Sequence, residues 1–394
     1  MSQILTSDHY IWSSDGDSDN QLIKIHVRCF GAYFEIQYLR HNLAASPYLL
    51  AQHEKSLCIM RAGDEGNSSD VENGIKEICR LQKPFEALMT ELAPNPPPPA
   101  THLFDYLYPP HMILEATAAT QDSTVIQPRF RGSLPRQVLW PPGQYLATWG
   151  DWLESVKCFT SRQVRLVHTS TDPEQHPCLR GPSKVTAGDG VGWDAVCYFK
   201  ALVRRVPGEL WAYKQIAAAL EAKKLRPEMR ISRLHGVVVD EDRDVLQHYD
   251  HVPKEELAKW DDFGSESKSE DESPARMVGI LITYIENKGT LYEVAPWSDC
   301  LDEHRRSWAD ELLGLVVELH KAGLVWGDAK PHNVLVDRQD RLWLIDFDGG
   351  YTHGWVDEVK KETKEGDLQG VERIKEWLAK YYEKPLDRSV PRSS

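Results

Sequence analysis

Residues 319–337 read LHKAGLVWGDAKPHNVLVD, and residues 342–350 read LWLIDFDGG. Apolar residues at helical spacing precede this segment, and Gly323 is the residue type that commonly follows the last turn of a helix. The aliphatic runs 334–336 and 342–345 predict two short strands with a turn between them. The segment therefore predicts a helix, a polar loop and a β-hairpin, in that order.

The polar residues of this segment have the chemistry that phosphoryl transfer requires. Such a reaction needs a carboxylate to orient the attacking hydroxyl, a cation beside the migrating phosphoryl group and oxygen ligands for Mg²⁺. The loop offers Asp328, Lys330 and Asn333, and Asp346 follows the second strand. The hairpin would return the chain so that Asp346 faces the loop. The alternative is a polar hairpin with incidental acids, which two linked patterns at this spacing disfavour.

These residues resemble the motifs of the protein-kinase-like superfamily. The stretch DAKPHN (328–333) is similar to the catalytic loop D-x-K-P-x-N, and DFD (346–348) is similar to D-F-G. The resemblance implies a phosphotransferase that uses ATP and Mg²⁺. In it Asp328 orients the acceptor hydroxyl and Lys330 stabilises the transferring phosphoryl group as catalytic residues, while Asn333 and Asp346 hold the metal on the nucleotide.

The acceptor itself is unknown from the sequence. In the superfamily, D-x-K loops such as the one containing Lys330 accompany Ser/Thr rather than Tyr acceptors. A serine or threonine of a protein is therefore slightly favoured over the hydroxyl of a small molecule.

Two upstream segments extend the resemblance. VCYFK (196–200) is similar to the kinase strand whose lysine holds the nucleotide phosphates, which assigns this role to Lys200. The alternative is a surface lysine whose alkyl stem packs along a strand. A helix expected over 209–224 would supply Glu209 as the ion-pair partner of Lys200. Glu209 is closer in sequence than kinases usually allow, so Glu221 is a second candidate.

Residues 277–286 read MVGILITYIE and predict a buried strand that runs into a hinge. In the resemblance, backbone groups around Tyr284 and Glu286 bind adenine.

The run EGDL (365–368) is similar to one in uncharacterised fungal kinase-like proteins, which also carry a G-D-x-K-P-x-N loop. That resemblance covers residues 150–382. It implies that Asp367 opens a helix and anchors the backbone of the catalytic loop. An ordinary acidic residue at the start of a helix is the alternative.

The sequence departs from the kinase pattern at several points. Trp326 and Gly327 stand where His-Arg usually precedes the catalytic aspartate, which removes the partner of a phosphorylated activation loop. Asp348 replaces the glycine of D-F-G, and no A-P-E follows. The part after Asp346 is short for a full helical lobe. These departures motivate a pseudokinase, which binds nucleotide or acts as a scaffold, as the alternative function.

The glycine cluster GDGVG (188–192) resembles a phosphate-binding loop, but few residues separate it from Lys200. Because a return strand and a turn have little room there, the cluster predicts a turn between strands. The loop that covers the phosphates is then expected between Arg165 and Val185.

The 394 residues include 46 basic and 60 acidic side chains, which gives a formal net charge of −14. An acidic chain disfavours nucleic acid as a partner. No run approaches the roughly 18 apolar residues of a membrane helix, so no membrane association is expected. The seven cysteines form no C-x-x-C pair and no signal peptide is recognised, so an intracellular protein, cytoplasmic or nuclear, is expected rather than a secreted one.

The expected fold class is α+β, with a bilobal protein-kinase-like fold that has a shortened C-terminal lobe. A small mixed α/β region precedes it. Strands are predicted over 22–27 and 33–39 with Gly31 between them, which favours a hairpin, and a helix predicted over 75–92 is interrupted near Pro84. The expected divisions of the chain are the N-terminal region of unknown role (1–93), a proline-rich linker and connecting segment (94–149), the kinase-like domain (150–382) with an acidic insertion (254–274), and a disordered tail (383–394).

Overall fold

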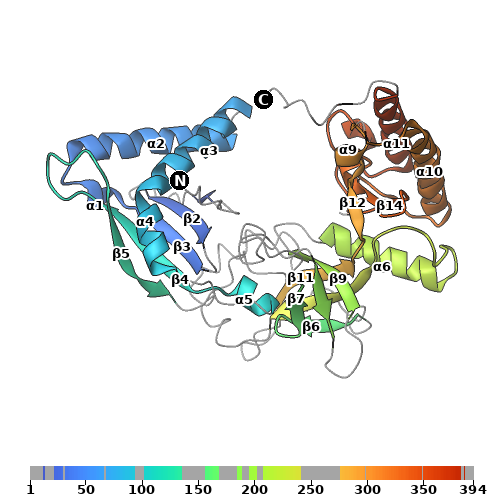
Figure 1. Ribbon diagram of the computed structural model, residues 1–394, viewed down its shortest axis with the longest axis horizontal. Helices are drawn as coiled ribbons and strands as arrows, with labels where there is room; N and C mark the ends of the chain where they lie inside the picture. The colour runs from blue at the N-terminus through green and yellow to red at the C-terminus, as the bar shows by residue number, and fades with distance from the viewer. Residues whose placement is uncertain are drawn as a thin grey trace. The chain divides into compact units, whose positions relative to one another are not determined.

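The computed structural model describes residues 12–13, 22–29, 32–65, 68–93, 102–134, 156–167, 184–188, 195–201, 207–240, 276–297, 299–347, 349–382 and 386. The chain forms two compact units (Figure 1). Unit 1 comprises residues 1–142, 159–195 and 240–273, and unit 2 comprises residues 143–158, 196–239 and 274–394. The proline run 94–99, the acidic insertion 254–274 and Asp348 lie outside the described residues, as does the C-terminal tail apart from Leu386.

A sheet with the strand order β1-β2-β3-β4-β5 forms the centre of unit 1. Its strands are β1 (Trp12–Ser13), β2 (Ile23–Cys29), β3 (Ala32–Tyr38), β4 (His111–Thr117) and β5 (Gln127–Leu134). Strands β2 and β3 pair antiparallel from Cys29 opposite Ala32, which confirms the predicted hairpin. Strands β3 and β4 pair parallel. A parallel pair needs a long crossover connection, and the helices of unit 1 lie within it.

The crossover helices are α1 (Arg40–Leu43), α2 (Pro47–Glu65), α3 (Ser68–Gln82), the 3-10 turn η1 (Lys83–Phe85) and α4 (Glu86–Leu92). The predicted interruption at Pro84 is confirmed, because η1 separates α3 from α4 and proline lacks the N–H that a helix interior needs. The helix begins earlier than residue 75, at Ser68. Phe34 of β3 and Phe85 of η1 are fully buried in one apolar cluster of unit 1.

The rest of unit 1 contains short elements. They are α5 (Leu103–Leu107), β6 (Cys158–Thr160), which straddles the boundary of the units, β7 (Val164–Leu166) and β8 (Val185–Ala187). Strands β7 and β8 pair antiparallel. Residues 168–183 between them, where the phosphate-covering loop is expected, lie outside the described residues, and so does most of the predicted turn at 188–192.

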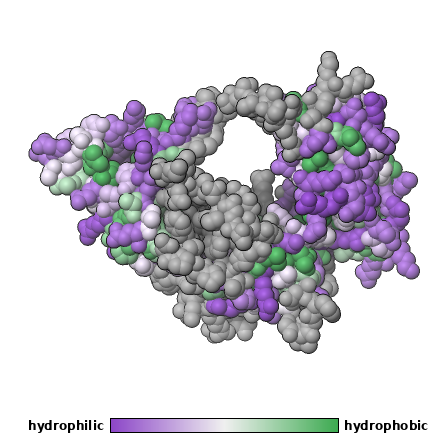
Figure 2. All heavy atoms as spheres, in the orientation of Figure 1, coloured by the Kyte–Doolittle hydropathy of each residue, from purple (hydrophilic) through white to green (hydrophobic). Residues whose placement is uncertain are grey.

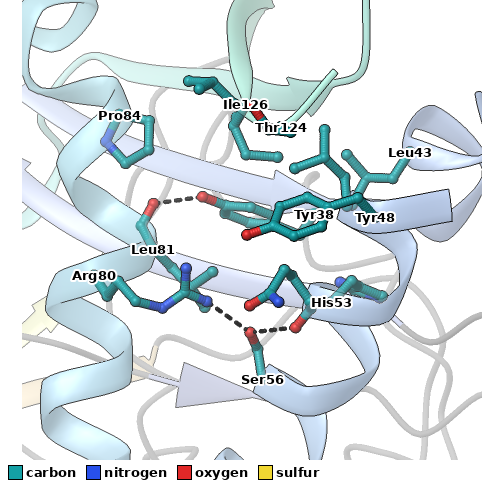
Figure 3. Close-up of a pocket in the computed structure, with 13 residues that line it drawn as sticks. Tyr38, Leu43, Tyr48, His53, Ser56, Arg80, Leu81, Pro84, Thr124 and Ile126 are labelled. Atoms are coloured by element: carbon teal, nitrogen blue, oxygen red, sulfur yellow. Dashed lines mark hydrogen bonds between the residues drawn. The ribbon is translucent and has the colours of Figure 1, made fainter. Parts of the chain in front are cut away.

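A pocket of about 190 Å³ in unit 1 lies between α2, the end of α3 and the segment before β5 (Figure 3). Its apolar lining includes Leu43 and Ile126, and its polar lining includes Ser56 and Arg80. The Arg80 guanidinium donates to Ser56 Oγ at 3.0 Å and forms an ion pair with Glu77 at 2.6 Å. The polar wall of this pocket is therefore held by hydrogen bonds within unit 1.

Unit 2 contains two groups of strands. Strands β9 (Ala195–Ala201), β11 (Arg276–Thr283) and β10 (Leu234–Asp240) lie side by side, with β11 in the middle. Strands β12 (Asn287–Thr290), β13 (Val334–Asp337) and β14 (Leu342–Leu344) form an antiparallel sheet. The second group confirms the hairpin predicted over 334–345. Strand β11 ends at Thr283 and residues 284–286 connect it to β12, which confirms the predicted strand that runs into a connecting segment.

The helices of unit 2 are α6 (Pro207–Glu221), α9 (Leu291–Val294), α10 (Asp302–Lys321) and α11 (Lys364–Ala379), with 3-10 turns η5 (Pro331–Asn333) and η6 (Glu358–Lys360). Helices α10 and α11 lie side by side (Figure 1). The predicted stop after α10 is confirmed, since Gly323 has φ +87°. Helix α11 begins at Lys364 rather than at the expected Asp367, because the Thr363 side chain caps it by accepting from the N–H of Gly366 at 3.0 Å.

One apolar core in unit 2 joins these helices to the strands, and its largest buried members include Trp308 and Trp326. On the face in view, Figure 2 shows mostly hydrophilic side chains over α10 and α11. Within the part of the chain that the structure describes, no helix is both long enough and apolar enough to cross a membrane.

Two helical glycines give a prediction about packing. A Cβ at Gly370 of α11 would lie 2.5 Å from the Cβ and 2.6 Å from the carbonyl oxygen of Ala329, whereas a Cβ at Gly314 of α10 would meet nothing within 4 Å. We expect Gly314→Ala to stabilise the protein by about 0.5–1 kcal/mol, because glycine is the poorer helix former. We expect Gly370→Ala to destabilise it by about 1–3 kcal/mol through overpacking. Urea denaturation of the two variants measures both effects, and a Gly370→Ala protein as stable as Gly314→Ala would contradict this packing.

Candidate active site

Lys200 lies at the centre of an ion-pair network in unit 2. Its Nζ lies 2.9 Å from Oε2 of Glu209 and 2.6 Å from Oδ1 of Asp346. Glu209 is buried in the first turn of α6, where the positive end of the helix dipole favours a carboxylate. Glu221, the other candidate partner, is exposed at the last residue of the same helix. The structure therefore pairs Lys200 with Glu209, and it brings Asp346 to the same ammonium group.

The two carboxylates keep Lys200 charged. Partial burial on its own lowers the pKa of a lysine, because the charged form loses water. The negative charges of Glu209 and Asp346, together with their hydrogen bonds, outweigh that effect and raise the pKa of Lys200 above its ordinary value. Lys200 is therefore a permanent cation next to the carboxylate of Asp346.

A second network surrounds Asp328, whose side chain is buried. Its Oδ2 accepts from Lys330 Nζ at 2.5 Å and from Asn333 Nδ2 at 3.3 Å, and its Oδ1 accepts from the Thr352 hydroxyl at 3.0 Å. Lys330 Nζ also donates to Thr352 Oγ1 at 3.0 Å. The Asn333 amide donates to the backbone carbonyl of Asp328 at 3.0 Å. The carboxylate of Asp328 is thus held in one orientation from three sides.

The backbone of the hairpin connects the two networks. Asn333 comes directly before β13, and Ile345 alone separates Asp346 from the end of β14. The Ile345 N–H donates to the Asn333 carbonyl at 3.0 Å, so both polar residues lie at the open end of the hairpin. Asp346 has φ +63°, in the left-handed region that few residues other than glycine, asparagine and aspartate enter. This unusual backbone turns the Asp346 side chain toward Lys200.

Trp326 supports that end of the hairpin from the core. Its indole N–H donates to the Ile345 carbonyl at 2.9 Å, and the residue is almost fully buried. The residue that stands where kinases have histidine therefore contacts the backbone immediately before Asp346. Its size fills the core while its single donor finds a partner.

Asp367 holds the start of the loop 326–333. Its Oδ2 accepts from the Trp326 N–H and its Oδ1 from the Gly327 N–H, each at 2.8 Å. His320 Nε2 lies 2.8 Å from Oδ2 as well. Asp367 is 1 % exposed, so these contacts are shielded from water. The anchoring of the loop backbone that the fungal resemblance implies is present in the structure.

Gly327 stands directly before Asp328, at the position where kinases usually have arginine. It has φ +98°, and a Cβ built on it would lie 3.0 Å from the Cα of Gly349. The segment after Asp346 therefore passes against the backbone of the loop 326–333. The Gly350 N–H in that segment donates to Glu362 Oε1 at 2.9 Å. A side chain at position 327 has neither the backbone conformation nor the space that it needs.

Tyr284 and Glu286, the expected adenine-binding residues, lie in the connection between β11 and β12. The Ile285 carbonyl between them accepts from the Asn287 side-chain amide at 2.8 Å. The structure therefore brings together Lys200, Glu209 and Asp346 in one network and Asp328, Lys330 and Asn333 in the other, whereas Tyr284 and Glu286 lie in the connection between β11 and β12.

Sequence reasoning did not single out Thr352 as a functional residue. It follows the D-F-G-like run by four residues, and isolated threonines are common in loops. The available signal in the sequence was the glycine pair at 349 and 350, since glycine is the residue type that readily adopts positive φ, and both residues do so in the structure.

Part of this chain is similar to proteins that are named kinases. Residues 266–385 match the lipopolysaccharide kinase (Kdo/WaaP) family. Over 75 residues the chain is 36 % identical to serine/threonine-protein kinase OXI1 of Arabidopsis thaliana, and over 82 residues it is 34 % identical to serine/threonine-protein kinase PKH3 of Eremothecium gossypii. These matches support a protein-kinase-like superfamily. They also support a kinase-like phosphotransferase, and a kinase family implies the use of ATP.

The matched relatives are compared over a small part of their length. Each of these two matches covers 18 % of this chain, and the matched part is 18 % of the Arabidopsis protein and 11 % of the Eremothecium protein. The mixed helices and strands of the chain are compatible with a kinase-like fold.

Proposed function

We propose that this protein is an ATP- and Mg²⁺-dependent phosphotransferase that acts on a hydroxyl group. The observation that carries this proposal is the buried Asp328 carboxylate, which Lys330, Asn333 and Thr352 orient within one network. Residues 150–382 would form the bilobal kinase-like domain, with residues 1–93 and 94–149 preceding it as a region of unknown role and a linker.

In the proposed mechanism, Asp328 accepts a hydrogen bond from the acceptor hydroxyl and orients its oxygen toward the phosphoryl group. Lys330 supplies a positive charge beside the phosphoryl oxygens as the group moves. Lys200, held by Glu209, binds the phosphates of the nucleotide. Backbone groups at Tyr284 and Glu286 would bind adenine.

The residues present fit a magnesium ion. Mg²⁺ prefers oxygen ligands, and Asn333 and Asp346 offer an amide oxygen and a carboxylate at the same end of the hairpin. These two residues would hold the ion, which would neutralise charge on the phosphates.

The acceptor is a hydroxyl in both kinds of matched relative, because one name refers to lipopolysaccharide and two refer to serine and threonine. We favour a serine or threonine of a protein over a small molecule, because the loop that contains Lys330 resembles the D-x-K loops that accompany Ser/Thr acceptors, and two matched relatives are named serine/threonine-protein kinases.

A thermal-shift measurement with ATP and Mg²⁺ tests the nucleotide site. A ligand at 100 times its dissociation constant stabilises the native state by about 2.7 kcal/mol, which is readily measured. We expect a Mg²⁺-dependent shift in the full-length protein, and we expect Asp346→Ala to remove its Mg²⁺-dependent part. Asp357→Ala, which changes an exposed aspartate elsewhere in unit 2, should keep the whole shift.

The outcome also separates the two candidate functions. A Mg²⁺-dependent shift followed by transfer of the γ-phosphate to an acceptor supports the enzyme. A shift without transfer to any protein or small-molecule acceptor favours a pseudokinase. A folded protein that shows no shift with ATP would contradict the nucleotide site itself.

A further inference from the structure

The pocket between α2, the end of α3 and the segment before β5 has an apolar side and a polar side. Figure 3 shows Leu43 and Ile126 on one side of it and Arg80 and Ser56 on the other. Its volume is about 190 Å³, and an apolar cavity of about 150 Å³ is large enough to hold benzene. The pocket therefore has room for one six-membered ring with a small substituent.

Aromatic and aliphatic side chains surround the space that such a ring would fill. Tyr38 lines the pocket and is 2 % exposed, and its hydroxyl donates to the Leu81 carbonyl at 2.5 Å. Because the polar end of Tyr38 already has a partner, its ring contributes an apolar wall. Tyr48 and Val125, which also line the pocket, are 52 % and 73 % exposed. Exposed apolar side chains that gather around a hollow are typical of binding sites, whereas scattered ones are ordinary.

The guanidinium of Arg80 can donate to a molecule in this pocket. Its Nε and Nη2 donate to the two carboxylate oxygens of Glu77 at 2.8 and 2.6 Å, and Nη2 also donates to Ser56 Oγ at 3.0 Å. Among the described residues, these three bonds leave the two N–H groups of Nη1, because a guanidinium has five N–H donors. The Arg80 side chain is 52 % exposed, so a molecule that enters the pocket can reach it.

The charge of Arg80 is already balanced. Its hydrogen bonds lower the pKa of Glu77, which keeps that carboxylate ionised at neutral pH, so the two side chains together carry no net charge. An anionic ligand would place a second negative charge near Glu77 and would lose water on entering the pocket, and both effects oppose binding. A neutral carbonyl oxygen avoids both effects. It still accepts a hydrogen bond from a charged donor, which is stronger than one from a neutral donor.

We propose that this pocket binds a small uncharged molecule that consists of a ring-sized apolar body and a carbonyl oxygen, with the oxygen accepting from Arg80 Nη1. The proposal gives the N-terminal region a binding function of its own, separate from the proposed phosphotransferase. The alternative is a hollow, filled by water alone, where the helices meet the segment before β5.

NMR titration of the full-length protein with three probes tests the proposal. Benzamide has a ring and a neutral carbonyl group, benzoate has the ring and a negative charge, and acetamide has the carbonyl group without the ring. We expect benzamide to bind, benzoate to bind more weakly, and acetamide to show no binding. Saturating Mg²⁺-ATP should not displace benzamide, because the two sites are distinct.

Two variants change opposite sides of the pocket. Arg80→Met keeps an unbranched apolar stem but removes the donors, and it should weaken benzamide binding about tenfold or more, since a hydrogen bond to a charged donor is lost. Ile126→Trp fills the pocket from a partly exposed position and should abolish benzamide binding. Arg40→Met is the matched control, because Arg40 forms an exposed ion pair with Glu54 and does not line the pocket. It should bind benzamide like the original protein.

The possible contrary results differ in what they overturn. No binding of benzamide to the original protein, or its displacement by Mg²⁺-ATP, would overturn the site. Unchanged binding in Ile126→Trp would also overturn it, because the probe would then lie elsewhere. Unchanged binding in Arg80→Met would overturn the role of Arg80 as the donor, and tighter binding of benzoate than of benzamide would overturn the uncharged class of ligand. The phosphotransferase is tested separately, by the thermal shift with ATP and Mg²⁺.

Discussion

Replacing Asp367 with alanine is expected to destabilise the protein by about 3–5 kcal/mol, the range seen when one partner of a buried charged network is removed. The carboxylate is 1 % exposed and accepts from the backbone N–H groups of Trp326 and Gly327. After its removal, both N–H groups stay buried without an acceptor, and each such group costs about 1–3 kcal/mol. His320 loses the same partner. Urea denaturation followed by tryptophan fluorescence measures the effect.

Two further variants show whether burial is the cause. Asp367→Asn keeps one oxygen acceptor, so we expect it to lower the free energy of unfolding by less than Asp367→Ala does. Asp357→Ala removes an exposed carboxylate that accepts from Arg373 at 2.8 Å and from Gln369 at 2.7 Å. This variant therefore loses similar hydrogen bonds, but at a position that water can reach. Exposed ion pairs contribute little to stability, and the denaturation midpoint should hardly move. Equal midpoints for Asp367→Ala and Asp357→Ala would rule out the anchoring role of Asp367.

Local patterns predict much of unit 2 because its elements have local causes. The hairpin β13–β14 follows from aliphatic runs with a polar turn between them, and the end of α10 follows from a glycine that adopts positive φ. The boundary of α11 is less predictable. Its start depends on the Thr363 hydroxyl, which caps the helix four residues before Asp367.

Contacts between distant residues have no comparable signature. The bond from Thr352 to Asp328 spans 24 positions, and the bond from the Trp326 indole to Ile345 spans 19. Both depend on the path of the segment after Asp346, which positive φ angles at several residues determine. The choice between Glu209 and Glu221 had the same difficulty, because sequence spacing does not say which end of α6 lies beside Lys200.

In the sheet of unit 1, pairing between neighbouring strands was also easier to predict from the sequence than pairing between distant strands. The hairpin β2–β3 was predicted from two adjacent runs of strand-forming residues, and it is present. The parallel pairing of β3 with β4 joins strands separated by a long helical connection. The sequence of neither strand indicates which strand it pairs with. Periodicity predicts that a strand has a buried face, but packing of the helices selects which neighbour it takes.

The second large effect concerns activity. Replacing Asp328 with asparagine is expected to lower kcat about 10²- to 10⁴-fold, the usual contribution of a positioned acid or base, while the affinity for Mg²⁺-ATP stays nearly unchanged. Asparagine has nearly the shape of aspartate and keeps an oxygen that can accept from Lys330 and Asn333. The fold should therefore survive, and what is lost is the negative charge that orients the acceptor hydroxyl. A γ-phosphate transfer assay with an identified acceptor measures kcat.

Thr352→Val separates charge from orientation at the same site. Valine has a similar shape but lacks the hydroxyl that bonds both Asp328 Oδ1 and Lys330 Nζ. Because the carboxylate remains and only its support is reduced, we expect a smaller fall in kcat than for Asp328→Asn, again with little change in nucleotide affinity. Equal activity of Asp328→Asn and the original protein would exclude Asp328 as the residue that orients the acceptor. A fall in nucleotide affinity as large as the fall in kcat would instead assign Asp328 to nucleotide binding, since a residue that acts only in the transfer step leaves the bound nucleotide unaffected.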